Sequence, residues 1–177
     1  MDIRQDQVLD FWFRDLHPDQ WFEEGEQLDP TILNRFGALH EEAASGRLDD
    51  WAATPSGRLA LILVLDQFSR HMYRGTERAF ATDTKAQQLA LDGIATGMDE
   101  KLAFAQRQFF YMPLMHAEDP ALQARSVERF TALVSYAERN LKFAQSHQAE
   151  IARYGRFPNR NEALGRNSTA EERDFLA

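Results

Sequence analysis

Two charged side chains in an otherwise aliphatic stretch are the first residues able to do chemistry. Asp66 and Arg70 follow the aliphatic run from Leu59 to Leu65 and stand four positions apart. On an α-helix this spacing places both side chains on one face, about 40° apart. A carboxylate beside a guanidinium on a hydrophobic face is either a structural ion pair that fixes the helix or the floor of a ligand pocket. The sequence leaves both interpretations open.

A histidine and a glutamate near Pro113 form the second polar group. On a regular helix His116 and Glu118 would diverge by about 160°, so they converge only if Pro113 kinks or ends the helix before them. One interpretation is a histidine at a helix C-terminus, where a cation is favoured. The other is a general base or a metal ligand at a helix break.

An arginine-rich loop is the third group. Segment 153–166 holds four arginines against one acid, which gives it a net charge of +3. Gly155, Pro158 and Gly165 predict that it is a shaped turn. Arginine forks bind carboxylate or phosphate oxygens through two hydrogen bonds. The loop therefore predicts an anion site or a clamp on the protein's own carboxylates, and the basic residues of 70–78 would extend such a site.

The candidate site joins these groups with their polar neighbours. We expect a ligand to contact Asp66, Gln67, Arg70, Tyr73, Arg74, His116, Glu118, His147, Arg156, Arg160, Asn161 and Arg166. The candidates for catalysis are His116, Glu118 and Asp66. Together with His147 these side chains have the chemistry of metal ligands, but their spacing matches no particular metal. No cofactor-binding motif occurs, so we expect neither a metal nor a cofactor.

Helices must position all of these residues. Alanine and leucine far outnumber valine and isoleucine, and no stretch alternates apolar and polar residues as a strand would. The sequence predicts an all-α fold of about seven helices stacked as antiparallel hairpins, in a degenerate tetratricopeptide-like superhelix. The helices are expected at residues 3–14, 30–44, 55–73, 83–96, 99–117, 120–152 and 169–176.

Local signals support the helix boundaries. Cap acceptors precede first-turn prolines at Asp29-Pro30, Thr54-Pro55 and Asp119-Pro120. Ser168 and Glu171 are spaced as a capping box that would open the last helix. The aromatic residues of 11–22 are predicted to pack in the core and at a helix corner.

Composition limits the class of protein. The net charge of −8 argues against a nucleic-acid binder. The chain has no cysteine, which excludes disulfides and cysteine-ligated zinc. Its aliphatic runs are far shorter than the roughly 20 residues of a membrane helix, and its first residues lack a signal-like apolar segment. We expect one cytoplasmic domain over 1–177 without nucleic-acid or membrane partners, of an oligomeric state that the sequence does not indicate.

Four motifs resemble one bacterial family, that of domain of unknown function 924. They are VLDFWF (8–13), LDQFSRHMYRGTERAFATDTKA (65–86), FFYMPLMHAED (109–119) and RYGRFPNRNEALGRNSTAEERDFL (153–176). The resemblance implies a tetratricopeptide-like helical fold and no assigned activity. The polar positions that carry it are Asp66, Gln67, Arg70, Tyr73, Arg74, Gly75, Asp83, Lys85, His116, Glu118, His147, Arg156, Pro158, Arg160, Asn161 and Arg166.

Three functions are compatible with these residues. The first is a binding protein whose arginine-bearing groove holds an anionic small molecule or a peptide carboxylate. The second is a hydrolase in which His116 or Glu118 is the base, Asp66 orients it or binds a metal, and Arg70 and Arg160 stabilise negative charge. The third is a scaffold without a small ligand, whose polar motifs hold the helices together.

Overall fold

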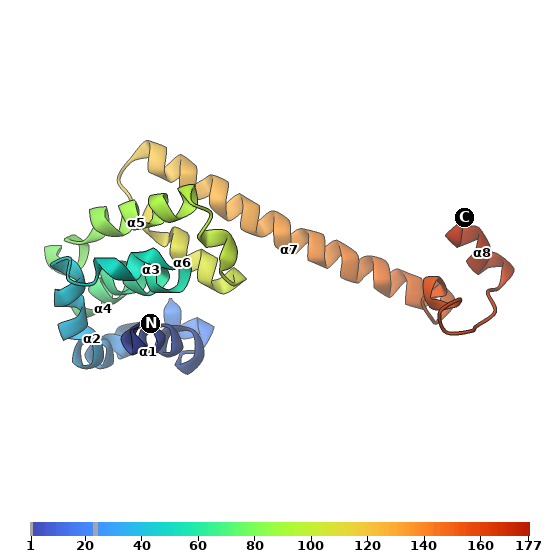
Figure 1. Ribbon diagram of the computed structural model, residues 1–177, viewed down its shortest axis with the longest axis horizontal. Helices are drawn as coiled ribbons and strands as arrows, with labels where there is room; N and C mark the ends of the chain where they lie inside the picture. The colour runs from blue at the N-terminus through green and yellow to red at the C-terminus, as the bar shows by residue number, and fades with distance from the viewer. Residues whose placement is uncertain (1, 23–24) are drawn as a thin grey trace. The chain divides into compact units, whose positions relative to one another are not determined.

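The described part of the chain is helical throughout. The computed structural model describes residues 2–22 and 25–177, and all regular elements in these ranges are helices (Figure 1). This confirms the all-α prediction. The chain divides into two compact units, which we call the N-terminal unit (Met1–Phe130) and the C-terminal unit (Thr131–Ala177). The tetratricopeptide-like arrangement and the single domain over 1–177 stay predictions.

The predicted helices are all present. The α-helices are α1 (Ile3–Asp10), α2 (Asp29–Ala44), α3 (Pro55–Ile62), α4 (Ser69–Met72), α5 (Asp83–Ala95), α6 (Phe104–Met115), α7 (Pro120–Tyr154) and α8 (Ala170–Leu176). Two π-helical segments are η1 (Phe11–Asp15) and η5 (Leu63–Phe68). Short 3₁₀ turns are η2 (Pro18–Trp21), η3 (Gly25–Leu28), η4 (Asp49–Ala53), η6 (Glu77–Phe80), η7 (Asp99–Lys101) and η8 (Pro158–Arg160).

A buried helical rod forms the centre of the N-terminal unit. Its parts, α3, η5 and α4, follow one another without a break over residues 55–72, and we call them the central rod. Every side chain from Leu59 to Leu65 is fully buried. Helices α1, α2, α5 and α6 pack around the central rod (Figure 1). The hydrophobic run of the sequence is therefore the core against which the other helices bury their apolar faces.

The aromatic residues near the N-terminus complete this core. Trp12 is fully buried. Its ring lies 5.6 Å from that of Phe68 and 5.4 Å from that of Phe109. This confirms the prediction of core packing for Trp12. Phe22, at the end of the same segment, is 58% exposed instead.

Two predicted caps form as expected. The Thr54 hydroxyl accepts a hydrogen bond from the Gly57 backbone N–H at 3.1 Å. The Asp119 carboxylate accepts two, from the backbone N–H groups of Ala121 and Leu122, at 2.8 and 2.9 Å. These bonds satisfy donors that the first helical turn leaves without partners.

Other helix starts differ from the prediction. Asp29 is the first residue of α2, not its cap, because its carboxylate bonds to His71 and Arg74. The predicted helix 99–117 begins at Phe104, since Ala103 has an extended backbone. The capping box of α8 lies one residue later than expected, at Thr169 and Glu172.

Candidate functional site

Asp66 is a buried carboxylate surrounded by donors. It lies in η5 at the middle of the central rod and is 0% exposed. Oδ2 accepts a hydrogen bond from Gln67 Nε2 at 2.6 Å. Oδ1 lies 3.0 Å from Arg70 Nη1 and 2.9 Å from His116 Nδ1. These partners compensate the hydration that a buried carboxylate loses, and they hold it in one position.

In the π-helical segment η5, two backbone carbonyls accept hydrogen bonds from side chains. A π-turn replaces the usual bond to the fourth residue back by one to the fifth, and such turns are frequent at functional sites. The Leu65 carbonyl accepts a bond from Thr82 Oγ1 at 2.6 Å, and the Asp66 carbonyl accepts one from Arg70 Nη1 at 3.0 Å. The irregular turn that carries Asp66 is therefore anchored by neighbouring side chains.

Arg70 joins two carboxylates. Its Nη1 contacts Asp66 Oδ1, and its Nη1 and Nη2 donate to the two oxygens of Asp83, both at 2.9 Å. Asp83 begins α5, so this bidentate pair fastens α5 to the central rod. With two carboxylates against one guanidinium, Arg70 has no excess positive charge to offer a ligand.

The predicted helix end after Pro113 is present, and it lets His116 and Glu118 line one cavity. Helix α6 ends at Met115, with His116 as its C-cap. Gln123 fixes the following loop by donating to the carbonyls of Met115 and Ala117 at 2.8 and 2.7 Å. Because residues 116–119 are not helical, His116 and Glu118 both line the same cavity.

This cavity of about 650 Å³ is the centre of the candidate site. It lies within the N-terminal unit and is lined by Arg70, Phe80, Asp83, Thr84, Gln87, His116, Ala117, Glu118 and Asp119. The His116 side chain is 24% exposed, and its Nδ1 faces Asp66. No described residue hydrogen-bonds its other nitrogen, Nε2. An ionised carboxylate can only accept, so a neutral imidazole that bonds to it through Nδ1 carries its proton there and leaves the Nε2 lone pair available.

Among the charged side chains that line the cavity, carboxylates outnumber cations. Asp83 and Arg70 offset each other's charge, while Asp119 serves as the α7 cap. Glu118 is exposed and makes no hydrogen bond or ion pair with any residue in 2–22 and 25–177. The wall therefore carries more carboxylates than cations, and an anionic ligand is disfavoured at this position.

Two predicted site residues that directly follow the central rod, Tyr73 and Arg74, lie in a different cluster. Arg74 holds Asp29 with bonds of 2.7 and 2.9 Å, and Tyr73 donates to Glu41 at 3.0 Å. Burial raises the pKa of Tyr73, and the bond to Glu41 adds to this. Neither Tyr73 nor Arg74 lines the cavity. Both side chains bind helix α2 or the turn at its start.

The remaining candidates belong to the C-terminal unit. Arg156 binds both oxygens of Glu172 at 2.6 and 2.7 Å, and this contact lowers the pKa of Glu172 to about 2. Asn161 donates to the same carboxylate at 3.2 Å. For Arg156, this is the arrangement of the clamp alternative, in which arginine holds the protein's own carboxylate.

Three other residues of that unit pack around one aromatic ring or its backbone. His147 lies with its ring 5.4 Å from Phe157, the Arg160 guanidinium lies 4.4 Å from the same ring, and Arg166 donates to the Phe157 carbonyl at 3.1 Å. A single site that joins these residues with those of the N-terminal unit stays a prediction.

The described residues were compared with what a metal site and a membrane-spanning helix require. In 2–22 and 25–177 no three histidine, aspartate or glutamate side chains lie together in a way that could hold a metal ion. Among the described helices none has the length and apolar character needed to cross a bilayer.

Sequence reasoning missed several residues of the cavity. Phe80, Asp83, Thr84, Gln87 and Asp119 line it but were not among the predicted site residues. Asp83 had a detectable signal, since it belongs to the motif 65–86 that also carries Asp66 and Arg70, and it begins a helix. The approach of α5 to the central rod, which brings these residues to Arg70, depends on long-range packing that no local pattern encodes.

Comparison with known proteins gives a family and a fold relative. A family model described as "Bacterial protein of unknown function (DUF924)" matches residues 8–177. A solved structure of a protein of unknown function from Agrobacterium tumefaciens is similar with a TM-score of 0.71 and 38% sequence identity. The similarity covers 98% of this chain and 97% of the other. No curated protein matches the chain.

Proposed function

The chain belongs to the DUF924 family of bacterial proteins, and from the geometry of its cavity we propose that it is a hydrolase. His116 is the general base and Asp66 is its positioning residue. The observation that carries this proposal is the 2.9 Å contact between Asp66 Oδ1 and His116 Nδ1, with the histidine ring on the wall of the cavity.

The chemistry of the pair explains why it supports a base. A buried carboxylate bonded to one imidazole nitrogen fixes the tautomer and the orientation of the ring. Nε2 then accepts a proton from a water molecule whose oxygen attacks the substrate. The imidazolium returns that proton to the leaving group, and Asp66 remains ionised throughout.

The arrangement of Arg70 supports this function over anion binding. An anion site requires positive charge that the protein itself does not compensate. Arg70 instead lies between Asp66 and Asp83, at 3.0 and 2.9 Å. The binding of an anionic small molecule or peptide carboxylate is therefore the second candidate, and it rests on Arg160, whose guanidinium lies over Phe157.

A scaffold function explains part of the site. It accounts for Asp66 and Arg70, which tie the central rod to α5. It gives no reason for a histidine that meets the buried carboxylate through one nitrogen and lines a cavity of about 650 Å³ with its ring. An inter-helix clamp needs no such open side.

Hydrolysis of a charge-varied panel tests the proposal. The full chain is incubated with p-nitrophenyl acetate, p-nitrophenyl phosphate and lysine p-nitroanilide, which are neutral, anionic and cationic. We expect turnover of at least one, and we expect His116→Asn to reduce it by about a hundredfold or more, the range of a general base.

The matched control is His17→Asn, which makes the same change at a histidine whose side chain is 73% exposed and lies outside the cavity. It should retain the wild-type rate and so corrects for non-specific ester cleavage by surface imidazoles. Hydrolysis of no panel member above buffer, or equal rates in His116→Asn and wild type, overturns the proposal.

A further inference from the structure

The acidic wall of the cavity has a consequence for what the site binds. Resting on the proposed function, we infer that the substrate carries a positively charged organic ammonium group, and that Glu118 is the residue that selects it. The inference concerns the substrate class, and it depends on the placement of charges around His116.

Glu118 is the carboxylate of the wall that makes no hydrogen bond or ion pair with a described residue. Asp83 is bonded to Arg70 at two oxygens, and Asp119 accepts the first N–H groups of α7. Glu118 contacts no cation within 2–22 and 25–177, although it lines the same cavity as His116. An ammonium group bound to it would therefore lie in the space that the proposed base also faces.

Arg70, the arginine among the described residues of the wall, does not repel such an ammonium group. Each acid–guanidinium contact of Arg70 is 3.0 Å or shorter, so its charge is compensated twice. A cation approaching Glu118 meets a local field that is negative on balance. An anion of the same size meets repulsion from Glu118 and from Asp119.

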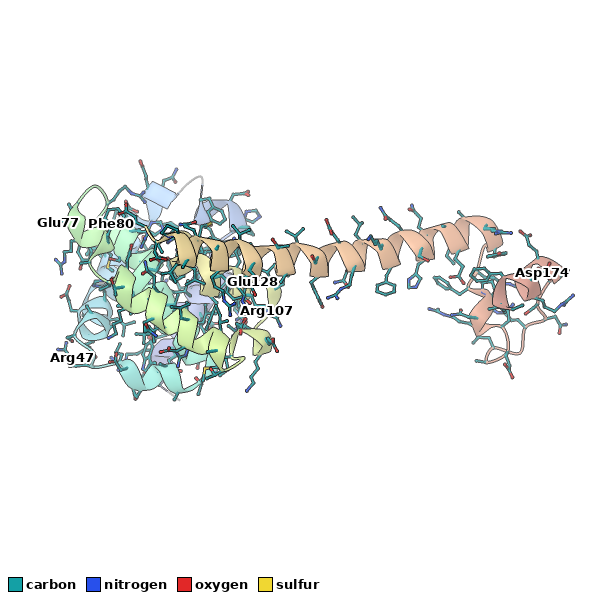
Figure 2. All side chains as sticks on the ribbon, turned by 90° about the horizontal axis from the view of Figure 1, so that it is seen from above. Arg47, Glu77, Phe80, Arg107, Glu128 and Asp174 are labelled. Carbon is teal, nitrogen blue, oxygen red and sulfur yellow. The ribbon has the colours of Figure 1, made fainter. Side chains whose placement is uncertain are left out.

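An aromatic ring at the edge of the cavity indicates the rest of the substrate. Phe80 lines the cavity and is 58% exposed, and Figure 2 shows it labelled beside Glu77 on the surface of the N-terminal unit. The Arg70 guanidinium lies 5.4 Å from the centre of this ring. The exposed part of the ring can pack against an apolar or aromatic group that is joined to the ammonium.

Three matched probes test the inference without requiring turnover. 2-Phenylethylamine, 2-phenylethanol and 3-phenylpropanoate share an aromatic ring and a two-carbon linker, and they differ in charge. Their binding to the full chain is measured by calorimetric titration or by chemical-shift changes of the His116 ring. We expect the amine to bind at least tenfold more tightly than the alcohol, the propanoate to bind weakest, and added salt to reduce the preference.

Glu118→Gln keeps the size of the side chain and removes its charge. We expect it to weaken amine binding by about tenfold, the effect of a charge pair near a protein surface, and to leave binding of the alcohol unchanged. The matched control is Glu128→Gln, an exposed glutamate on α7 that pairs with Arg125 outside the cavity and lies apart from Phe80 in Figure 2. This variant should bind all three probes as the wild type does.

The outcomes separate the inference from the proposed function. The alcohol or the propanoate binding as tightly as the amine, an unchanged affinity in Glu118→Gln, or no binding of any probe overturns the inference. If instead the amine is preferred and Glu118→Gln weakens it, but His116→Asn does not affect hydrolysis, the cation site is upheld and the hydrolase is rejected. Turnover that depends on His116 without a preference for the amine upholds the hydrolase and rejects the cation site.

Discussion

Two histidine–aspartate pairs lie against the same central rod and differ in their surroundings. In the first, His116 Nδ1 is 2.9 Å from Asp66, and the ring lines a cavity. In the second, His71 Nδ1 is 2.8 Å from Asp29. There the ring is buried against Trp12, and Arg74 binds the same carboxylate. Equal pair geometry thus occurs in an open site and in a closed clamp.

The difference shows that a histidine–aspartate contact alone does not indicate chemistry. A base needs a nitrogen that can reach a reacting molecule, and His116 has this access whereas His71 is 7% exposed. The carboxylates differ as well. Asp66 lies in the rod with its side chain 1% exposed, while that of Asp29 is 23% exposed at the start of α2. The open pair is built on the more deeply buried charge.

The largest difference should appear in stability when each carboxylate is removed. Asp66→Ala leaves Arg70 and His116 without a deeply buried partner, which costs about 3–5 kcal/mol. Asp29→Ala removes a contact whose partner, Arg74, is 45% exposed, so we expect only about 1–2 kcal/mol. Urea unfolding followed by tryptophan fluorescence measures both, because Trp12, Trp21 and Trp51 all lie in the N-terminal unit. Equal losses would contradict the comparison.

The sequence predicted one side of this comparison well. Asp66 and Arg70 were recognised because charges four residues apart on an aliphatic helix are unusual, and their contact forms as expected. The sequence indicates that His116 and Glu118 can converge only if Pro113 kinks or ends the helix, and α6 does end at Met115. These predictions succeeded because they depend on local periodicity and on the backbone chemistry of proline.

Features of both pairs that depend on tertiary contacts could not be predicted. Asp29 was interpreted as a cap because an acid before proline usually is one, but tertiary contacts to His71 and Arg74 take its carboxylate instead. The π-helix of η5 was not predicted, because its aliphatic residues fit a regular buried α-helix equally well. The partnership of Arg70 with Asp83 spans thirteen positions and requires α5 to dock on the rod.

Replacing each of the two histidines by asparagine should separate an effect on activity from an effect on stability. His116→Asn is expected to reduce hydrolysis about a hundredfold or more, as a lost general base does, with a modest change in stability. His71→Asn should leave hydrolysis unchanged and lower the free energy of unfolding by about 1–2 kcal/mol, because it alters a buried polar contact. Rate assays and urea unfolding are performed on both variants. A loss of hydrolysis in His71→Asn would show that the clamp contributes to the site.

A third histidine, His40, extends the comparison of the two histidine–aspartate pairs, because no aspartate pairs with it among the described residues. His40 is 3% exposed, and neither ring nitrogen forms a hydrogen bond with a described residue. Burial lowers its pKa below 6.5, although Glu41 acts in the opposite direction. As the pH falls below 6.5, His40 therefore becomes protonated in the unfolded chain while it stays neutral in the folded chain. The free energy of unfolding decreases by at most about 1.4 kcal/mol per pH unit because of this group. His40→Phe should flatten the profile measured between neutral pH and pH ~5.5, whereas an unchanged slope would assign the effect to other groups.

The smallest effect concerns how the contribution of Asp29, bonded to His71 and Arg74, depends on pH. Burial alone would raise the pKa of Asp29, but the hydrogen bonds from Arg74 and His71 outweigh it, so its pKa lies below 3.8. The folded state thus keeps Asp29 ionised where the unfolded state is protonated. Its contribution is complete above the unfolded pKa of about 3.9 and is lost as the pH falls through the folded pKa.

Asp29→Asn should therefore lose stability relative to wild type above about pH 4, and the two curves should converge at lower pH. The comparison must be made as a difference between the two proteins, because Asp2 titrates in the same acidic range. Its hydrogen bonds with Arg4 lower the pKa of Asp2 to about 2, and this effect is common to both proteins. Curves that stay parallel down to the acid transition would mean that the Asp29 charge contributes nothing, and that His71 and Arg74 hold α2 through contacts that a neutral amide makes equally well.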